Sequence, residues 1–174
     1  MEKVIQLLNR MQADGIMEKF AIGGGIAAVY YTEPHATGDI EVFISPTVLA
    51  QSGPGSLEPV HDYLENLGYF ADKEGVLIED WLVRFVPTFA SVQEEAVEQA
   101  RRVAYGEDHT FIFSAEHLGA EFIRSATYKD HARLIDLVES ARIDMKVFRE
   151  IISRHDLSDK WKELARRFDW GSDE

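Results

Sequence analysis

The chain has 174 residues, of which 45% are hydrophobic and 28% are charged, and it contains no cysteine. This composition is typical of one globular domain and excludes a disordered chain, while the lack of cysteine excludes a disulfide scaffold, a cysteine nucleophile and a thiolate zinc site. The net charge of −13 opposes general binding to DNA or RNA, because an acidic surface repels phosphate backbones.

The first 20 residues are amphipathic and lack the unbroken apolar core of a signal peptide. No apolar run approaches the ~18 residues that span a bilayer. The missing cysteines suit a reducing compartment. We therefore expect a cytoplasmic protein with no membrane partner.

The first quarter of the chain predicts a helix, a strand, a glycine turn, a second helix and a second strand. Apolar residues recur at helical spacing over 2–14, and Gly15 follows as a stop signal. The apolar run 20–22 leads into Gly23-Gly24-Gly25, and small and apolar residues continue to Tyr31. The segment 39–44 alternates with period two, which predicts a strand with Ile40, Val42 and Ile44 on one face and Asp39, Glu41 and Phe43 on the other.

The middle of the chain predicts a loop, two helices and four strands. Turn residues mark a loop at 51–55, and a helix then ends at Gly68. Two hairpins are expected, one from strands 76–78 and 82–86 and one from strands 103–105 and 110–113, with a helix over 93–102 between them.

From Ser114 onward the pattern is helical, with helices expected over 115–126, 129–141, 145–154 and 157–168. The sequence thus predicts an α/β (α+β) fold with a core over 1–114 and a C-terminal helical part over 115–174 packed on it. We expect a mixed sheet with residues 39–44 as a central strand and helices on one face.

The glycine turn and the carboxylates after it are the segment that points to chemistry. Glycines between a strand and a helix let the backbone approach a ligand and leave helix amides free for a phosphate. Asp39 and Glu41 on one face of a strand can share a divalent metal ion. Each feature alone is better explained by a tight turn or by the solvent face of a strand, but their order and closeness together favour a site.

This ordered set resembles the polymerase-beta-like nucleotidyltransferase superfamily, in particular the minimal bacterial group related to abortive-infection toxin nucleotidyltransferases. The resemblance extends over residues 18–140. Two motifs near the start carry it: Gly-Gly before a small-residue helix, and Thr37-Gly-Asp-Ile-Glu41 on a strand. Further matches are Leu82–Pro87, which resembles a later core strand, and the segments Ser114–Leu118 and Tyr128–Leu134, which resemble a pair of helices with a Lys-Asp signature.

The resemblance implies a nucleotidyltransferase-type fold and Mg²⁺-dependent transfer of a nucleotide monophosphate from a nucleoside triphosphate to a hydroxyl of a small molecule, protein or RNA. In that scheme Asp39 and Glu41 hold the metal, Gly24 and Gly25 cradle a phosphate, and Thr37 and Lys129 assist. The group it resembles suggests a role in a toxin–antitoxin system. A helix-start charge pair is an equally good interpretation of Lys129 and Asp130.

Two departures from the family pattern matter. The usual Asp-x-Asp is here Asp39-x-Glu41, and the position of the usual third carboxylate lies near Arg84. Arg84 either faces the carboxylates, where it would compete with a metal, or is exposed and paired with Glu79 or Asp80. The inward orientation would favour a second function, a catalytically degenerate module that binds a nucleotide or a protein.

The histidines show no pair with the close, same-face spacing of a zinc site. His35 is the one in the loop just before the carboxylates. It is expected to be a plain loop residue, and contact with a substrate phosphate is the alternative.

Overall fold

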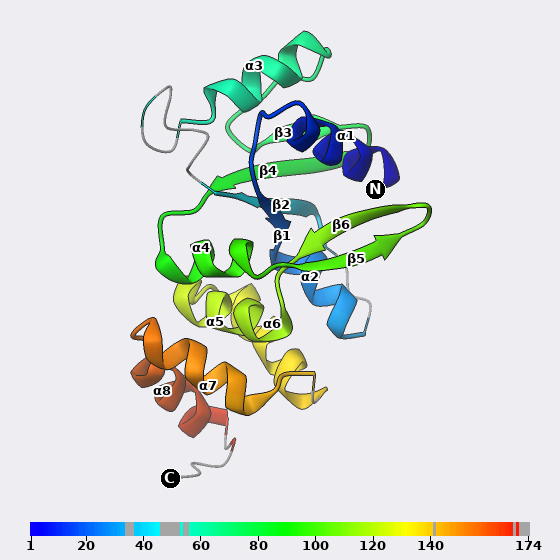
Figure 1. Ribbon diagram of the computed structural model, residues 1–174. Coiled ribbons are helices and arrows are strands. Elements are labelled where there is room, and N and C mark those ends of the chain that lie inside the picture. The colour runs from blue at the N-terminus through cyan, green and yellow to red at the C-terminus, as the bar shows by residue number, and fades with distance from the viewer. Residues whose placement is uncertain (34–36, 46–52, 54–55, 141, 169, 171–174) are drawn as a thin grey trace.

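The computed structural model describes the chain except for residues 34–36, 46–52, 54–55, 141, 169 and 171–174. Most of the loop expected at 51–55, and His35, therefore lie outside the described residues. The described part is built on a six-stranded mixed sheet (Figure 1). The strands are β1 (Phe20–Ile22), β2 (Asp39–Ile44), β3 (Val76–Ile78), β4 (Trp81–Pro87), β5 (Arg101–Tyr105) and β6 (Asp108–Ile112).

The strand order β3-β4-β2-β1-β6-β5 makes β2 an inner strand, as the sequence predicts. β2 runs parallel to β4 and antiparallel to β1, while β1 runs parallel to β6. The pairs β3–β4 and β5–β6 are the two expected antiparallel hairpins. β4 pairs with the whole of β2, whereas β1 pairs with residues 42–44. Because the Gly23 N–H also donates to the Glu41 carbonyl, the Glu41 backbone is held on both sides, and that of Asp39 is held by β4.

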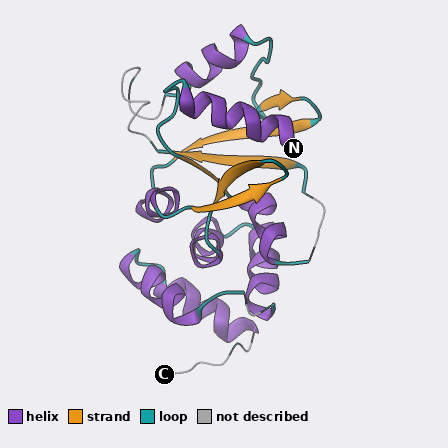
Figure 2. Ribbon diagram, turned by 45° about the vertical axis from the view of Figure 1, so that its right-hand side comes forward, coloured by secondary structure: helices purple, strands orange, loops and turns teal. Residues whose placement is uncertain are grey.

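Helices cover both faces of this sheet, so the expectation of helices on one face is wrong. On one side lie α1 (Glu2–Ala13), which contacts β6, and α3 (Glu58–Asn66). On the other lie α2 (Gly24–Tyr31) and α4 (Ser91–Glu98), both in contact with β2 (Figure 2). The reason is visible in β2, because Ile40, Val42 and Ile44 are fully buried on one face while Phe43 is also buried on the other.

The C-terminal part is helical, as expected: α5 (Ala115–Ser125), α6 (Tyr128–Glu139), α7 (Met145–Arg154) and α8 (Ser158–Phe168). Side-chain caps begin three of these helices, with Ser114 starting α5, Thr127 starting α6 and Asp144 starting α7. α5 packs against α2 and α4 of the core and against α6 and α7, so one hydrophobic cluster runs through both parts. No helix in the described part of the chain is long and apolar enough to cross a membrane.

The helix expected over 93–102 is wrong at its end, because Arg101 and Arg102 belong to β5. The apolar helical period stops at Val97, and the chain then pairs with β6, Arg101 opposite Ile112 and Arg102 opposite Phe111. Cross-strand pairing is a tertiary contact that local helical spacing does not reveal.

Candidate functional site

The glycine turn joins β1 to α2 directly beside β2. The Gly23 N–H donates to the Glu41 carbonyl at 2.9 Å, which fixes the turn to the strand that carries the carboxylates. Gly24 has φ +57, a left-handed conformation, and any side chain there would overlap the Glu41 carboxylate. At Gly25 a Cβ would lie 2.6 Å from Thr37 Oγ1 and 2.7 Å from Arg133 Nη2. The structure thus brings Gly24, Gly25, Thr37 and Glu41 together.

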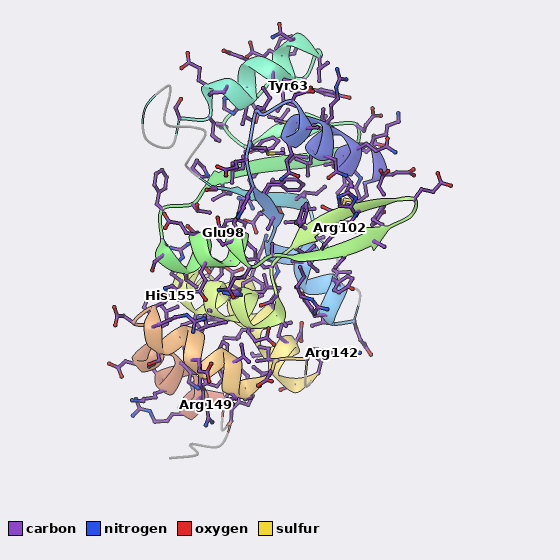
Figure 3. The ribbon with its side chains drawn as sticks, in the orientation of Figure 1. Tyr63, Glu98, Arg102, Arg142, Arg149 and His155 are labelled. Atoms are coloured by element: carbon purple, nitrogen blue, oxygen red, sulfur yellow. The ribbon has the colours of Figure 1, made fainter. Side chains whose placement is uncertain are left out.

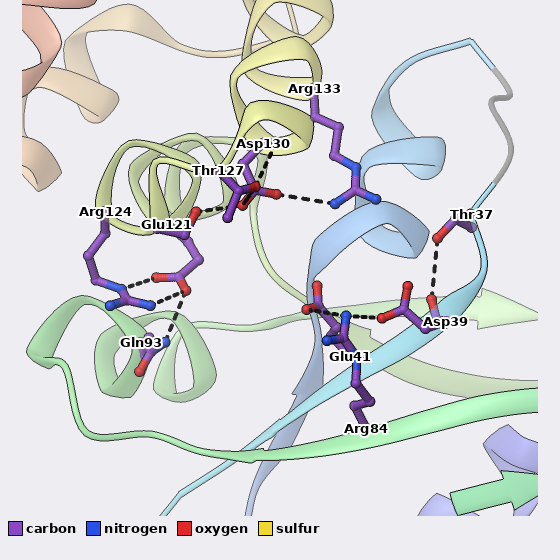
Figure 4. A network of polar contacts seen from close by, with 11 residues as sticks. Thr37, Asp39, Glu41, Arg84, Gln93, Glu121, Arg124, Thr127, Asp130 and Arg133 are labelled. Atoms are coloured by element: carbon purple, nitrogen blue, oxygen red, sulfur yellow. Dashed lines mark hydrogen bonds and ion pairs between the residues drawn. The ribbon is translucent and has the colours of Figure 1, made fainter. Parts of the chain in front are cut away.

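Asp39 and Glu41 share one face of β2, and Arg84 of β4 joins them. Arg84 lies opposite Glu41 in the parallel β2–β4 register, and its Nη2 donates to Glu41 Oε1 at 3.0 Å and to Asp39 Oδ2 (Figure 4). The carboxylate side chains are 20% and 24% exposed and that of Arg84 is 47% exposed. Arg84 therefore faces the carboxylates from the solvent side, and Glu79, the alternative partner, accepts instead from Lys3 and Tyr69.

Burial raises the pKa of Glu41 above its ordinary value. The Arg84 guanidinium acts in the opposite direction and lowers that pKa, while the negative charges of Asp39 and Asp130 raise it. Glu41 is thus a carboxylate whose charged form depends on its arginine partner.

Helix α6 contributes a second arginine and a third carboxylate. Arg133 Nη1 donates to Asp130 Oδ1 at 3.2 Å, and Asp130 Oδ2 accepts from Ser125 Oγ and Thr127 Oγ1, both at 2.6 Å (Figure 4). Lys129 is exposed and makes no hydrogen bond or ion pair within the described residues. It is Arg133, not Lys129, that reaches the glycine turn.

The sequence does contain a signal for Arg133. At 100° per residue, Asp130 lies within the arc of α6 marked by the buried Leu134 and Leu137, and Arg133 lies closer to that arc than Lys129 does. A pair of opposite charges three residues apart on the inward side of a helix indicates a buried ion pair.

A divalent cation does not fit this donor set as it stands. Mg²⁺ requires near-octahedral oxygen coordination, and Asp39 and Glu41 are both engaged by Arg84 Nη2. In the part of the chain that the structure describes, no three side chains of His, Cys, Asp or Glu are grouped to hold a metal ion. The guanidinium occupies the place between the carboxylates where the sequence predicted a metal.

Comparison with known proteins shows similarity at the level of the fold. No protein-family model matches the sequence, and no curated protein does. The solution structure of the antibiotic-resistance factor ANT(2'')-Ia matches with a TM-score of 0.50 and 15% identity, covering 98% of this chain and 99% of that one. An antigenic nucleotidyltransferase-like protein from Paracoccidioides brasiliensis matches with a TM-score of 0.53 and 14% identity, covering 92% of this chain and 91% of that one. The chain therefore has a nucleotidyltransferase-like fold, as its sequence predicts.

Proposed function

We propose that this protein binds a nucleotide at the glycine turn and does not transfer it, because Arg84 takes the place of the catalytic metal ion. The observation that carries the proposal is the double hydrogen bond from Arg84 Nη2 to Asp39 and Glu41. A cation placed beside this guanidinium would meet repulsion on the order of 1–4 kcal/mol at contact distance, depending on solvent access. The same guanidinium supplies a permanent positive charge, since arginine does not lose its proton in proteins.

The phosphate groups would lie at the start of α2. The first amides of a helix have no partner within the helix and carry partial positive charge, and no side chain caps α2. Glycine at 24 and 25 permits close approach to the backbone, as in other phosphate-binding turns, and the side chains of Glu41, Thr37 and Arg133 line that approach. Within the described residues Arg84 uses one terminal nitrogen, on the two carboxylates, which leaves its other N–H donors for an anion.

The first test is the melting temperature with ATP, GTP, CTP and UTP in excess EDTA. At a nucleotide concentration of 100 times Kd, the folded state gains about 2.7 kcal/mol. That gain corresponds to roughly 5–10 °C for a chain of this size. No rise with any of the four nucleotides at millimolar concentration would reject the proposal.

Metal-dependent transfer of a nucleotide monophosphate to a hydroxyl is the second candidate, and one observation favours it. Arg84 is more exposed than the carboxylates it bridges, so its side chain can leave toward solvent. In ANT(2'')-Ia, substrate regulates the conformational dynamics, and a similar response here would free Asp39 and Glu41. Protein and RNA acceptors, a toxin–antitoxin role and a cytoplasmic location rest on the sequence alone.

Labelling with radioactive nucleotides and Mg²⁺ separates the two candidates. Wild type, Asp39→Asn and Arg84→Asp are incubated with protein and RNA acceptors. Binding without transfer predicts no labelling by wild type and gain of labelling in Arg84→Asp, which restores a third carboxylate. Strong wild-type labelling that Asp39→Asn abolishes would establish transfer instead.

A further inference from the structure

Arg133 is a second guanidinium directed at the glycine turn, and it comes from the C-terminal helical part. Its Nη2 lies 2.7 Å from the position of a Cβ on Gly25, and Thr37 Oγ1 lies 2.6 Å from the same position. The arginine side chain is only 16% exposed. A long cationic side chain is rarely buried to this extent unless its charge is paired or used.

Asp130 accepts a hydrogen bond from one guanidinium nitrogen of Arg133, Nη1. The Asp130 side chain is 14% exposed, and its Oδ1 accepts this hydrogen bond from Arg133. Its Oδ2 accepts from the hydroxyl groups of Ser125 and Thr127. Within the described residues Arg133 Nη2 makes no hydrogen bond, so that nitrogen is directed toward Gly25 with its donors unused.

The neighbouring pair on α5 shows the opposite arrangement. Arg124 also bonds an acid three residues before it, but it donates from both Nε (2.6 Å) and Nη2 (2.8 Å) to Glu121, which Gln93 also binds at 3.0 Å. Figure 4 shows this closed pair away from the glycine turn, whereas Arg133 extends from α6 toward α2. Two ion pairs of the same sequence spacing thus differ in geometry: Arg124 bonds its acid through two nitrogens, whereas Arg133 bonds its acid through Nη1 and directs Nη2 at Gly25.

We infer that Arg133 binds a phosphate of the nucleotide held at Gly24 and Gly25, and that Asp130 is the residue that positions it. This inference rests on the proposed function and deepens it. Both parts of the chain then form the nucleotide site: the core supplies the glycine turn, and α6 supplies Arg133. Arginine suits the task because its planar donors match phosphate oxygens.

The experiment compares ATP with adenosine, which lacks phosphates, by calorimetric titration of the full chain in EDTA. Wild type is expected to prefer ATP. Arg133→Gln is expected to weaken ATP binding roughly 10- to 100-fold, the effect of losing one charge-assisted hydrogen bond, and to leave adenosine binding unchanged. Arg133→Lys keeps the charge and is expected to recover part of the loss.

Arg124→Gln is the matched control, because it removes an arginine of the same spacing from the same region. It is expected to lower the melting temperature while keeping the preference for ATP over adenosine. Asp130→Asn should weaken ATP binding less than Arg133→Gln does, since it loosens the arginine without removing it. A folded Arg133→Gln that retains the full wild-type preference for ATP would overturn the inference. If Arg133→Gln does not fold, the same result for Arg133→Met, which also removes the charge, would overturn it. A wild type that binds no nucleotide would reject the proposed function itself.

Discussion

Gly24 is the residue at which the turn tolerates least change. Alanine in the left-handed region costs about 1–2 kcal/mol, and at position 24 its Cβ would also displace the Glu41 carboxylate. We expect Gly24→Ala to lower the free energy of unfolding by roughly 2–4 kcal/mol, within the usual range for strain plus a forced shift.

Gly106 provides the control, because its φ of +59 is nearly that of Gly24 while a Cβ there would meet nothing within 4 Å. Gly106→Ala should therefore cost only the backbone part. Equal losses for the two variants in urea denaturation would show that the Glu41 carboxylate moves aside without cost.

Arg84 controls the ionisation of Glu41. Burial raises the pKa of Glu41 above 4.5 and Arg84 opposes that rise, so Arg84→Gln should raise the pKa further. A group whose folded pKa is raised stabilises the fold below its unfolded pKa, and this contribution is lost as pH rises through the folded value. In Arg84→Gln this stabilising contribution of Glu41 should persist to higher pH than in wild type. Carbon-13 NMR titration of the Glu41 carboxyl group measures the pKa, and urea denaturation against pH measures the stability. A lower or unchanged midpoint for Glu41 would contradict this assignment.

At the scale of elements, Glu95 of α4 ties the core to the C-terminal helices. It accepts from His117 of α5 at 3.1 Å, from Arg154 of α7 and, at 2.7 Å, from His155, which follows α7. Figure 3 shows His155 between the end of α7 and the start of α8 in the C-terminal helical part. Hydrogen bonding to Arg154 lowers the pKa of Glu95 to about 2, with the two histidines acting in the same direction. Burial lowers the pKa of His117, which favours its neutral form.

We expect Glu95→Gln to destabilise the fold at pH 7 by roughly 1–3 kcal/mol, since it removes the charge that three donors share. A lowered folded pKa means that the contribution of Glu95 is present above its ordinary pKa of 4.5 and is lost as pH falls toward 2. The difference between wild type and Glu95→Gln in urea denaturation should therefore shrink over that interval.

The control is Glu98→Gln on the same helix, whose partner Lys19 lies in an exposed pair at 2.5 Å. Exposed pairs contribute about 0–1 kcal/mol, so this variant should remain close to wild type. A loss as large as that of Glu95→Gln would mean that the stability of α4 does not depend on its link to α7.

At the scale of the whole molecule, the sequence predicts elements better than it predicts their contacts. β2 was predicted with its bounds and both faces, because period-two alternation is a local signal. The sequence left two orientations open for Arg84, and only the pairing of β2 with β4 places it opposite Glu41. Arg133 was missed for the same reason, because the packing of α6 against α2 brings together residues more than 100 positions apart.

The place of Arg84 between the carboxylates is the central claim, and calorimetric titration of wild type and Arg84→Gln with ATP, GTP, CTP and UTP tests it directly. Each protein is titrated in excess EDTA and again with Mg²⁺. We predict that wild type binds at least one nucleotide in EDTA, with a Kd on the order of 1 mM or tighter, and gains little from Mg²⁺. Arg84→Gln should bind more weakly in EDTA and regain affinity with Mg²⁺, because the carboxylates are then free to hold the cation. Wild-type binding that appears only with Mg²⁺ would contradict the account.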